Sequence, residues 1–387
     1  MIKLAIILII YFLTYTNTQN PDIHYPEIIR IGIFNQLDID KFSFSVIDGK
    51  YKIQDNNNSL LKTIQPYDLV VIEKTDEGIK LVNEKDTVFS EGNISLLGQS
   101  FKNTFLISPI NDNNKIGYRM YDSDLLIKNK PSGLNIINKV PFENYIAGVV
   151  QSESGFGRHP EYYNLQATIS RTYAIKNLDR HKDEDFHLCD EVHCQAYYSK
   201  SIYPEIILAT EYTRGDIIID KQGLPINTVF HANCGGVTVN SEDVWLNATP
   251  YLKEIVDTFC IDKPGARWEE RISKKEINQY LDKKLEDKFT DTVANKIYNF
   301  SQQNRKTFLD PFQIIHLGSF RNDFELRSTY FNMELQKDSI IIKGRGHGHG
   351  VGLCQEGAME MANHGLSRDS IIRFYYRNAF IKTIENY

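Results

Sequence analysis

The sequence lacks several features that would assign it at once to a class of protein. After Leu4–Leu13 no apolar run is long enough to cross a bilayer. There is no internal repeat and no GK[ST] phosphate-binding loop. An excess of one charge is missing too, because 44 Lys and Arg stand against 50 Asp and Glu, a net charge of -6. We therefore expect no nucleic-acid partner and no general attraction to anionic membranes.

The N-terminus carries the one long apolar run. Lys3 precedes Leu4–Leu13, and small and polar residues follow at Thr14–Asn20. Residues 1–19 thus have the pattern of a Sec signal peptide, with an uncleaved N-terminal anchor as the alternative. We predict an exported protein, in the periplasm or at the cell surface.

Cysteine is scarce, and its number is odd. At least one of the five is therefore outside any intramolecular disulfide. In an exported protein the default fate of cysteine is a disulfide, and a metal site is the competing fate. The five are Cys189, Cys194, Cys234, Cys260 and Cys354.

The hydrophobic pattern predicts an α+β protein with two domains. Short alternating runs predict a β-rich accessory domain at residues 20–115, in which Asp48-Gly49 is typical of a hairpin turn. The Asn/Asp-rich segment Asn111–Asn114 is the predicted linker. The larger second domain, residues 116–387, combines helices with mixed β structure.

Within the second domain the apolar period changes from two to about 3.6 residues at several places. It predicts helices from Val140 to Glu153 and from His159 to Leu178. A polar helical insertion is expected at Lys274–Lys306 and a last helix at Gln355–His364, whereas Ile206–Ile219 is typical of a strand.

Glu153 is the first candidate for chemistry. It falls on or beside the apolar stripe of its predicted helix, with Ile146. Burial raises the pKa of a carboxyl, and a carboxylic acid that stays protonated near neutral pH can donate a proton. The alternative is a solvated Glu, or one paired with Arg158 or Arg171.

A second candidate is the cluster of His and Cys from His181 to Cys194. Cys189 and His193 are four residues apart, and Cys194 follows directly. Two thiolates and one or two imidazoles suit a tetrahedral Zn²⁺. A Cys189–Cys194 disulfide is the alternative.

Two glycine-containing segments are further candidates. Gly344–Ala358 repeats glycine around His349 and precedes Gln355, so its backbone is expected to turn tightly or to lie close to a ligand. His231–Gly236 follows a predicted strand. Its Cys234 has either a disulfide to Cys260 or a metal as its expected partner.

Taken together, these segments resemble one family. The resemblance extends over about Tyr118–Tyr376. The segments resemble the SpoIID/LytB domain family, which comprises stage II sporulation protein D and amidase-enhancer relatives. The resemblance rests on blocks that occur in the family's order: Val140–Glu153, Gln166–Ala174, Cys189–Gln195, His231–Thr238 and Gly344–Ala358. The sequence departs from the family pattern at Ser154, where Met is common, and at Cys234, where Ser or Thr is common.

The resemblance implies peptidoglycan chemistry. Family members of the sporulation type are lytic transglycosylases, which cleave the MurNAc–GlcNAc bonds of peptide-stripped glycan strands and leave 1,6-anhydro ends. The family's catalytic Glu falls on Glu153, as general acid and then base. Polar groups expected to contact substrate are Arg171, His231, His349 and Gln355.

The resemblance also implies a zinc ion in a structural role. Its ligands would be Cys189, His193 and Cys194, with His181 as the fourth and His187 as the alternative. A second expectation from the same family is a non-catalytic, wall-binding enhancer of an N-acetylmuramyl-L-alanine amidase. A zinc hydrolase is a third.

Overall fold

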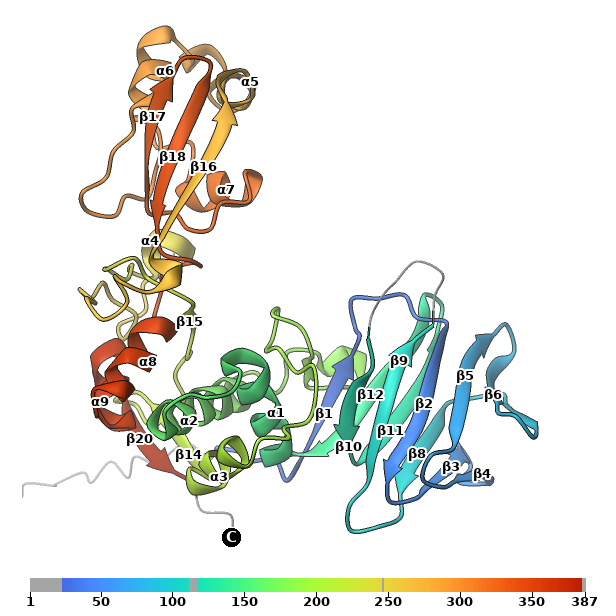
Figure 1. The fold of residues 1–387 in the computed structure, drawn as a ribbon. Helices are drawn as coiled ribbons and strands as arrows, with labels where there is room; N and C mark the ends of the chain where they lie inside the picture. Colours follow the sequence, from blue (N-terminus) through green and yellow to red (C-terminus); the bar gives the residue numbers. More distant parts are fainter. Residues whose placement is uncertain (1–22, 111–116, 246, 385–387) are drawn as a thin grey trace, which may run out of the picture.

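The computed structural model describes residues 23–110, 117–245 and 247–384 (Figure 1). The predicted signal peptide and the predicted linker Asn111–Asn114 lie outside these residues. None of the described helices combines the length and the apolar character needed to cross a membrane.

A β-sandwich of two facing sheets forms one end of the bent molecule (Figure 1). The seven-stranded sheet has the order β13 (Leu188–Cys189), β1 (Ile28–Ile33), β12 (Gly133–Pro141), β11 (Asp124–Lys130), β8 (Ile94–Gly98), β3 (Tyr51–Asp55) and β4 (Leu60–Ile64). The six-stranded sheet has the order β10 (Arg119–Asp122), β9 (Thr104–Pro109), β2 (Lys41–Asp48), β5 (Leu69–Thr75), β6 (Gly78–Val82) and β7 (Thr87–Ser90).

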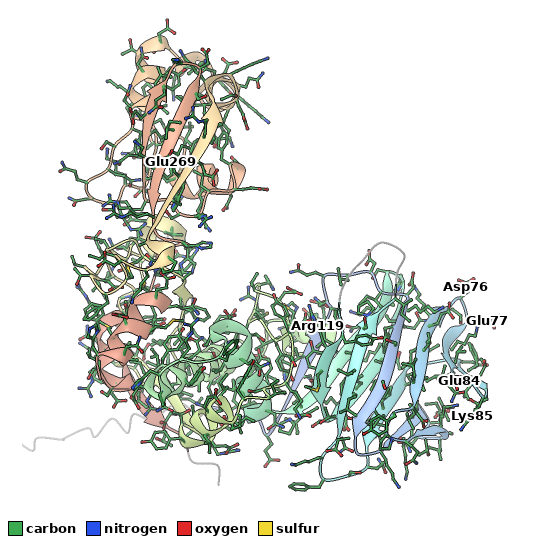
Figure 2. All side chains as sticks on the ribbon, in the orientation of Figure 1. Asp76, Glu77, Glu84, Lys85, Arg119 and Glu269 are labelled. Atoms are coloured by element: carbon green, nitrogen blue, oxygen red, sulfur yellow. The ribbon has the colours of Figure 1, made fainter. Side chains whose placement is uncertain are left out.

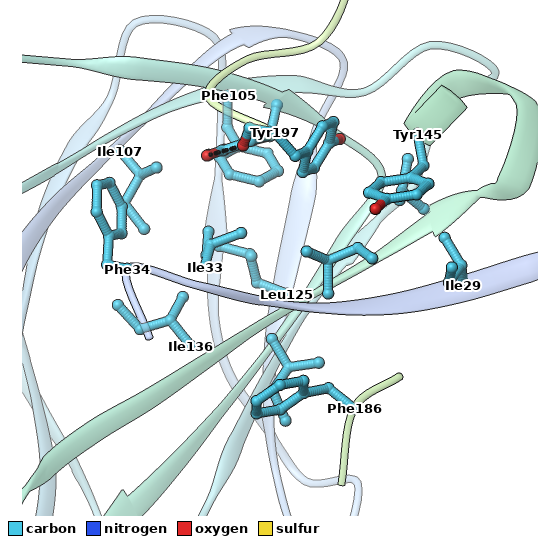
Figure 3. Close-up of a cluster of buried hydrophobic side chains, with 14 of the residues drawn as sticks. Ile29, Ile33, Phe34, Phe105, Ile107, Leu125, Ile136, Tyr145, Phe186 and Tyr197 are labelled. Carbon is cyan, nitrogen blue, oxygen red and sulfur yellow. Dashed lines mark hydrogen bonds between the residues drawn. The ribbon is translucent and has the colours of Figure 1, made fainter. Parts of the chain in front are cut away.

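Aromatic side chains fill the space between the two sheets. Phe44 of β2 lies 5.3 Å from Tyr51 of β3 and 5.0 Å from Phe105, measured between ring centroids. The same buried cluster continues to the first helix. Tyr145 of that helix lies 5.0 Å from Tyr197 of a later loop, measured between ring centroids (Figure 3). One continuous core therefore joins the sandwich to the helix that carries Glu153.

Strand pairing crosses the predicted domain boundary at residue 115. Strands β10, β11 and β12 come after it in the chain, yet they pair with β9, β8 and β1. The hairpin predicted at Asp48-Gly49 is also wrong, because the two strands that this turn joins do not pair with each other. The turn leads from β2 in one sheet to β3 in the other, and β2 pairs with β5 and β9.

Helices and short strand pairs form the middle of the molecule (Figure 1). The two small sheets are β14 (Asp216–Ile219) with β20 (Phe380–Thr383), and β15 (Phe230–His231) with β19 (Leu353–Cys354). The helices are α1 (Phe142–Ser154), α2 (Pro160–Lys176), α3 (Pro204–Tyr212), α4 (Glu242–Trp245), α8 (Gln355–Asn363) and α9 (Arg368–Tyr375), with one 3₁₀ turn at Lys182–Glu184 and another at Pro264–Ala266.

The last unit has a core of its own at the other end of the molecule. Its sheet has the order β16 (Arg267–Ser273), β18 (Ser339–Arg345) and β17 (Phe331–Gln336). Around it lie α5 (Lys274–Leu285), a 3₁₀ turn (Glu286–Lys288), α6 (Asp291–Tyr298) and α7 (Leu317–Asp323).

The predicted α+β class is confirmed, with a β-rich N-terminal region and helices around the candidate carboxyl. The polar insertion is helical as predicted, in α5 and α6. The strand predicted at Ile206–Ile219 is wrong over its first half. Pro204 sits at the first turn of α3, where its fixed φ favours a helix, and only Asp216–Ile219 is extended.

Candidate active site

A groove of about 870 Å³ brings the separate sequence blocks together. Its walls come from the end of α1, the loop before Gln195, strand β15 and the glycine-rich segment. Residues predicted for the site that line this groove are Glu153, His193, Cys194, His231, His349 and Gln355.

Glu153 lies in the last turn of α1 and is half-buried. Burial raises the pKa of its carboxyl, and the opposing influence is one hydrogen bond that the Ala196 N–H donates to Oε1 at 3.1 Å. Neither predicted partner pairs with it: Arg158 donates to the Ser154 carbonyl and Arg171 to Glu143. Among the described residues no ion pair includes Glu153, so this carboxyl is free to exchange a proton in the groove.

The position of α1 depends on a close approach at Gly148. A Cβ atom at this position would lie 2.4 Å from the Tyr197 ring. Tyr145, one helical turn earlier, donates a hydrogen bond to Gln195 Oε1 at 3.2 Å. The Gln195–Tyr197 segment is thereby held against α1, and the same segment presents the Ala196 N–H to Glu153.

The predicted His/Cys ligands converge at one side of this groove. The potential ligand atoms of His181, Cys189, His193 and Cys194 all lie within 4.8 Å of one another. His193 Nδ1 is 3.7 Å from both sulfur atoms, and His181 Nε2 is 3.4 Å from Cys194 Sγ. Two thiols and two imidazoles at these separations match a tetrahedral zinc site.

Neighbouring contacts orient the cluster. Glu184 Oε1 lies 2.6 Å from His181 Nδ1, a carboxylate–histidine pair typical of zinc ligands. His187 is not in the cluster, because its Nδ1 accepts a hydrogen bond from the Arg30 N–H at 3.2 Å. Arg180 Nη2 lies 3.1 Å from His193 Nε2. Metal on Nδ1 would leave a proton on Nε2, so both atoms would be donors and Arg180 would have to turn away.

The β-sandwich fixes the loop that carries three of these predicted ligands, Cys189, His193 and Cys194. Strand β13 lies parallel to β1, with Cys189 beside Gly32. Next to it, Asp190 accepts from Arg119 Nη1 at 2.6 Å and from the Phe34 N–H at 2.7 Å. Arg119 lies on the side of the sandwich that faces the helices (Figure 2). The N-terminal sheets thus take part in building the groove.

Two groove side chains have unused polar atoms. His231 places Nδ1 3.1 Å from the Val351 carbonyl, while its Nε2 is buried without a partner among the described residues. Burial lowers the pKa of His231, so the ring is neutral and Nε2 is an acceptor. Gln355 Nε2, a donor, is likewise buried and has no partner in the described structure. Both atoms are closed off from solvent in this structure, so contact with a ligand hydroxyl requires the side chains that cover them to move.

His349 and Arg171 differ from the predicted roles. Both ring nitrogens of His349 meet backbone, at the Phe230 carbonyl (2.9 Å) and the Val351 N–H (3.0 Å), so only its ring remains for a ligand. Arg171 is fully buried and pairs with Glu143 through two hydrogen bonds of 2.9 and 2.7 Å. That geometry contradicts a substrate contact by Arg171, which holds α2 to α1 in the core.

The glycine-rich segment turns tightly, as its composition predicts. Gly346, Gly348, Gly350 and Gly352 all have φ between 71° and 107°, in the left-handed region that glycine adopts without strain. This backbone places His347 and His349 in the lining of the groove that also contains His193.

Among the groove side chains that sequence reasoning missed are Trp245 and Arg321. Trp245 lies 5.1 Å from the His349 ring, measured between centroids, and is partly exposed. Arg321 reaches the groove from α7 of the last unit. Neither stands in a recognisable motif, and only the folded chain brings them to Glu153.

Comparison with known proteins gives a consistent result. The sequence model of the stage II sporulation protein family (SpoIID) matches residues 130–219. An uncharacterized protein of Brachyspira hyodysenteriae is 30% identical over 259 residues, which cover 64% of this chain and 68% of that protein. Stage II sporulation protein D of Bacillus subtilis is 25% identical over 318 residues, or 72% of this chain and 90% of that protein.

The amidase enhancer of Bacillus subtilis is also similar. It is 25% identical over 286 residues, which are 60% of this chain and 39% of the enhancer. Residues 130–219, which the family model matches, include α1, α2 and the His/Cys cluster. The chain therefore belongs to the SpoIID/LytB family.

Proposed function

We propose that this protein acts on the cell wall as a lytic transglycosylase, cleaving the MurNAc–GlcNAc bonds of glycan strands that have lost their stem peptides. The observation that carries this proposal is Glu153, a half-buried carboxyl that forms no ion pair with any residue in the described ranges. Burial raises its pKa, and it opens onto the groove. The names of the relatives, a sporulation protein and an amidase enhancer, support a function at the wall.

One carboxyl is enough for this reaction. Protonated Glu153 donates its proton to the glycosidic oxygen, and the bond from that oxygen to MurNAc C1 breaks. The 6-hydroxyl of the same MurNAc then attacks C1, and the Glu153 carboxylate takes the hydroxyl proton. The products are a 1,6-anhydro end and a new GlcNAc 4-hydroxyl, and Glu153 is protonated again.

The other groove residues have supporting roles in this proposal. His231 Nε2 and Gln355 Nε2 bind sugar hydroxyl or acetamido groups, which satisfy their unused hydrogen bonds. Trp245 offers an aromatic face to a sugar ring. Removal of the stem peptide leaves a free lactyl carboxylate on MurNAc, and Arg321 and Arg180 supply cationic groups in the same groove.

The His/Cys cluster is proposed to hold a structural zinc ion. Four protein ligands would make a bound zinc a structural ion, and it would stabilise the loop that carries Cys189, His193 and Cys194. That loop continues from Cys194 to Ala196, whose N–H contacts Glu153. The cluster therefore influences the reaction by positioning Glu153. Its members are His181, Cys189, His193 and Cys194.

The test is product analysis with purified protein and amidase-treated glycan strands. The proposal predicts fragments with 1,6-anhydro ends, and cleavage that survives brief exposure to a chelator in the folded protein. Hydrolysed, reducing ends would contradict it and would favour a zinc hydrolase. No fragments at all, together with faster release of stem peptides from intact peptidoglycan by a wall amidase when this protein is added, would favour the non-catalytic enhancer.

A further inference from the structure

A second group of potential metal ligands lies in the core behind the groove wall. Cys234 follows β15, Asp257 and Cys260 belong to the loop before the last unit, and Cys354 precedes α8. All four are fully buried, and their potential ligand atoms lie within 4.8 Å of one another. Cys234 Sγ is 3.3 Å from Cys260 Sγ and 3.4 Å from Asp257 Oδ2.

We propose that Cys234, Asp257, Cys260 and Cys354 form a second zinc site, separate from the His/Cys cluster beside Glu153. Three thiolates and one carboxylate are a donor set that zinc accepts in tetrahedral geometry. The site is closed to solvent, so its role is structural. This inference does not depend on the proposed reaction of Glu153.

Hydrogen bonds around the four side chains match a ligand role. Asp257 Oδ2 accepts from the Tyr375 hydroxyl at 2.8 Å, and Oδ1 accepts from the Phe259 N–H at 3.0 Å. Ordered metal sites have such outer donors, which fix the carboxylate in place. Asp257 therefore has one oxygen facing the sulfur atoms while the protein holds its orientation.

Cys354 has the surroundings of a thiolate. Its sulfur accepts from the Cys234 N–H at 3.3 Å and from the Gly357 N–H at 3.4 Å. It is also the N-cap of the nine-residue helix α8, whose dipole favours a negative charge at this end. Without a cation, however, a fully buried thiolate beside other thiols and a carboxylate is strongly disfavoured. A bound zinc ion removes that conflict.

A Cys234–Cys260 disulfide is the competing arrangement for an exported protein. It accounts for two of the four residues and leaves the sulfur of Cys354, with its two N–H donors, unexplained. It also gives no role to the Asp257 oxygen that the Tyr375 hydroxyl holds close to the sulfur atoms. A metal site uses all four side chains, and for this reason we favour it.

The second zinc would stabilise the part of the groove that carries His231 and Gln355. Cys234 comes three residues after His231, and Cys354 directly precedes Gln355. Strands β15 and β19, which carry His231 and Cys354, pair with each other. The two proposed zinc sites thus support different parts of the groove, one in the loop that contacts Glu153 and one next to the segments that carry His231 and Gln355.

The test is the zinc content of the full mature chain, purified without chelator. We expect two zinc ions per chain in the wild type and one in each of Cys354→Ser and Cys194→Ser, the latter being the matched change in the first cluster. Equal zinc content in the wild type and Cys354→Ser would overturn the proposal, as would a wild type whose zinc is lost entirely in Cys194→Ser.

A measurement on the wild type covers the case in which Cys354→Ser does not fold. After denaturation with a chelator, thiol titration and peptide mapping should find all five cysteines reduced. Three thiols and a peptide that links Cys234 to Cys260 would instead establish the disulfide and overturn the zinc site. Cobalt substitution should also give thiolate-to-metal absorption that remains in Cys194→Ser.

Discussion

Helix α1 carries two carboxyls with opposite surroundings. Glu143, in the first turn, is buried and bound by both nitrogens of the Arg171 fork, with the Tyr25 hydroxyl as a further donor. Glu153, in the last turn, has a single backbone donor and faces the groove. Burial alone does not mark a catalytic acid. A buried carboxyl with a complete set of partners stabilises the fold, whereas one that lacks them retains a raised pKa and a proton to give.

The largest effect on stability is expected from breaking the ion pair between Glu143 and Arg171. Arg171→Met leaves Glu143 buried without its cation, which should lower the free energy of unfolding by about 3–5 kcal/mol. The measurement is urea unfolding followed by circular dichroism. The double variant Glu143→Leu, Arg171→Met should recover part of the loss, because no charge then stays buried. If Arg171→Met were as stable as the wild type, the claim that the Glu143–Arg171 pair stabilises the fold would be wrong.

A change in the His/Cys cluster should lower the rate of the reaction through Glu153 and should leave the Glu143–Arg171 pair intact. Cys194→Ser disturbs the loop that places the Ala196 N–H on Glu153, and misplacement of a catalytic group by about 1 Å can lower the rate about a hundredfold. Steady-state cleavage of denuded strands measures this loss. Cys354→Ser, at the second sulfur cluster, should lower the rate less, since it does not touch this loop. Full activity of Cys194→Ser would show that Glu153 needs no support from the cluster.

A smaller effect is expected from the cation that the last unit brings to the groove. Arg321→Met removes a group suited to a lactyl carboxylate, and a charge-assisted hydrogen bond of about 1.5–3 kcal/mol corresponds to a rise in KM of about ten- to a hundredfold. The rise should be present with denuded strands and weaken in high salt. An unchanged KM for denuded strands would place the carboxylate elsewhere.

The smallest effect is a gain in stability when Glu153 is replaced by Gln. The pKa of Glu153 in the folded chain lies above its ordinary value of 4.5, so the folded state holds the proton more tightly than the unfolded state does. Below pH 4.5 both states are protonated and the variant should match the wild type. As the pH rises through the raised pKa, Glu153 of the folded wild type becomes a poorly solvated carboxylate, which lowers the free energy of unfolding. Glu153→Gln acquires no such charge.

Unfolding curves at acid and neutral pH test this sign. Glu153→Gln should be more stable than the wild type at neutral pH only, because the amide oxygen can still accept from the Ala196 N–H. Glu143→Gln is the matched control in the same helix and should be less stable at neutral pH. A less stable Glu153→Gln would mean that the carboxylate has a partner in solution.

Local sequence patterns predicted much of this arrangement. The helix of Glu153 and the closeness of the four proposed ligands follow from period and spacing together with the family blocks, since these residues lie close together in the chain. The four are His181, Cys189, His193 and Cys194. The partner of Arg171 did not follow, because nothing in the sequence distinguishes Glu143 from Glu153 as its neighbour. The pairing of β10–β12 with N-terminal strands is long-range and was assigned to a separate domain. The second sulfur cluster joins residues from Cys234 to Cys354, and only tertiary structure brings its members together.

The most direct test of the central claim is mass spectrometry of amidase-treated peptidoglycan digested by the wild type, Glu153→Gln and Glu143→Gln, each confirmed as folded by circular dichroism. The wild type and Glu143→Gln should release 1,6-anhydro fragments at similar rates per folded molecule. Loss of a general acid lowers a rate by about 10²–10⁴-fold, so Glu153→Gln should release almost none. Anhydro fragments from Glu153→Gln at the wild-type rate would contradict the assignment of Glu153 as the working carboxyl.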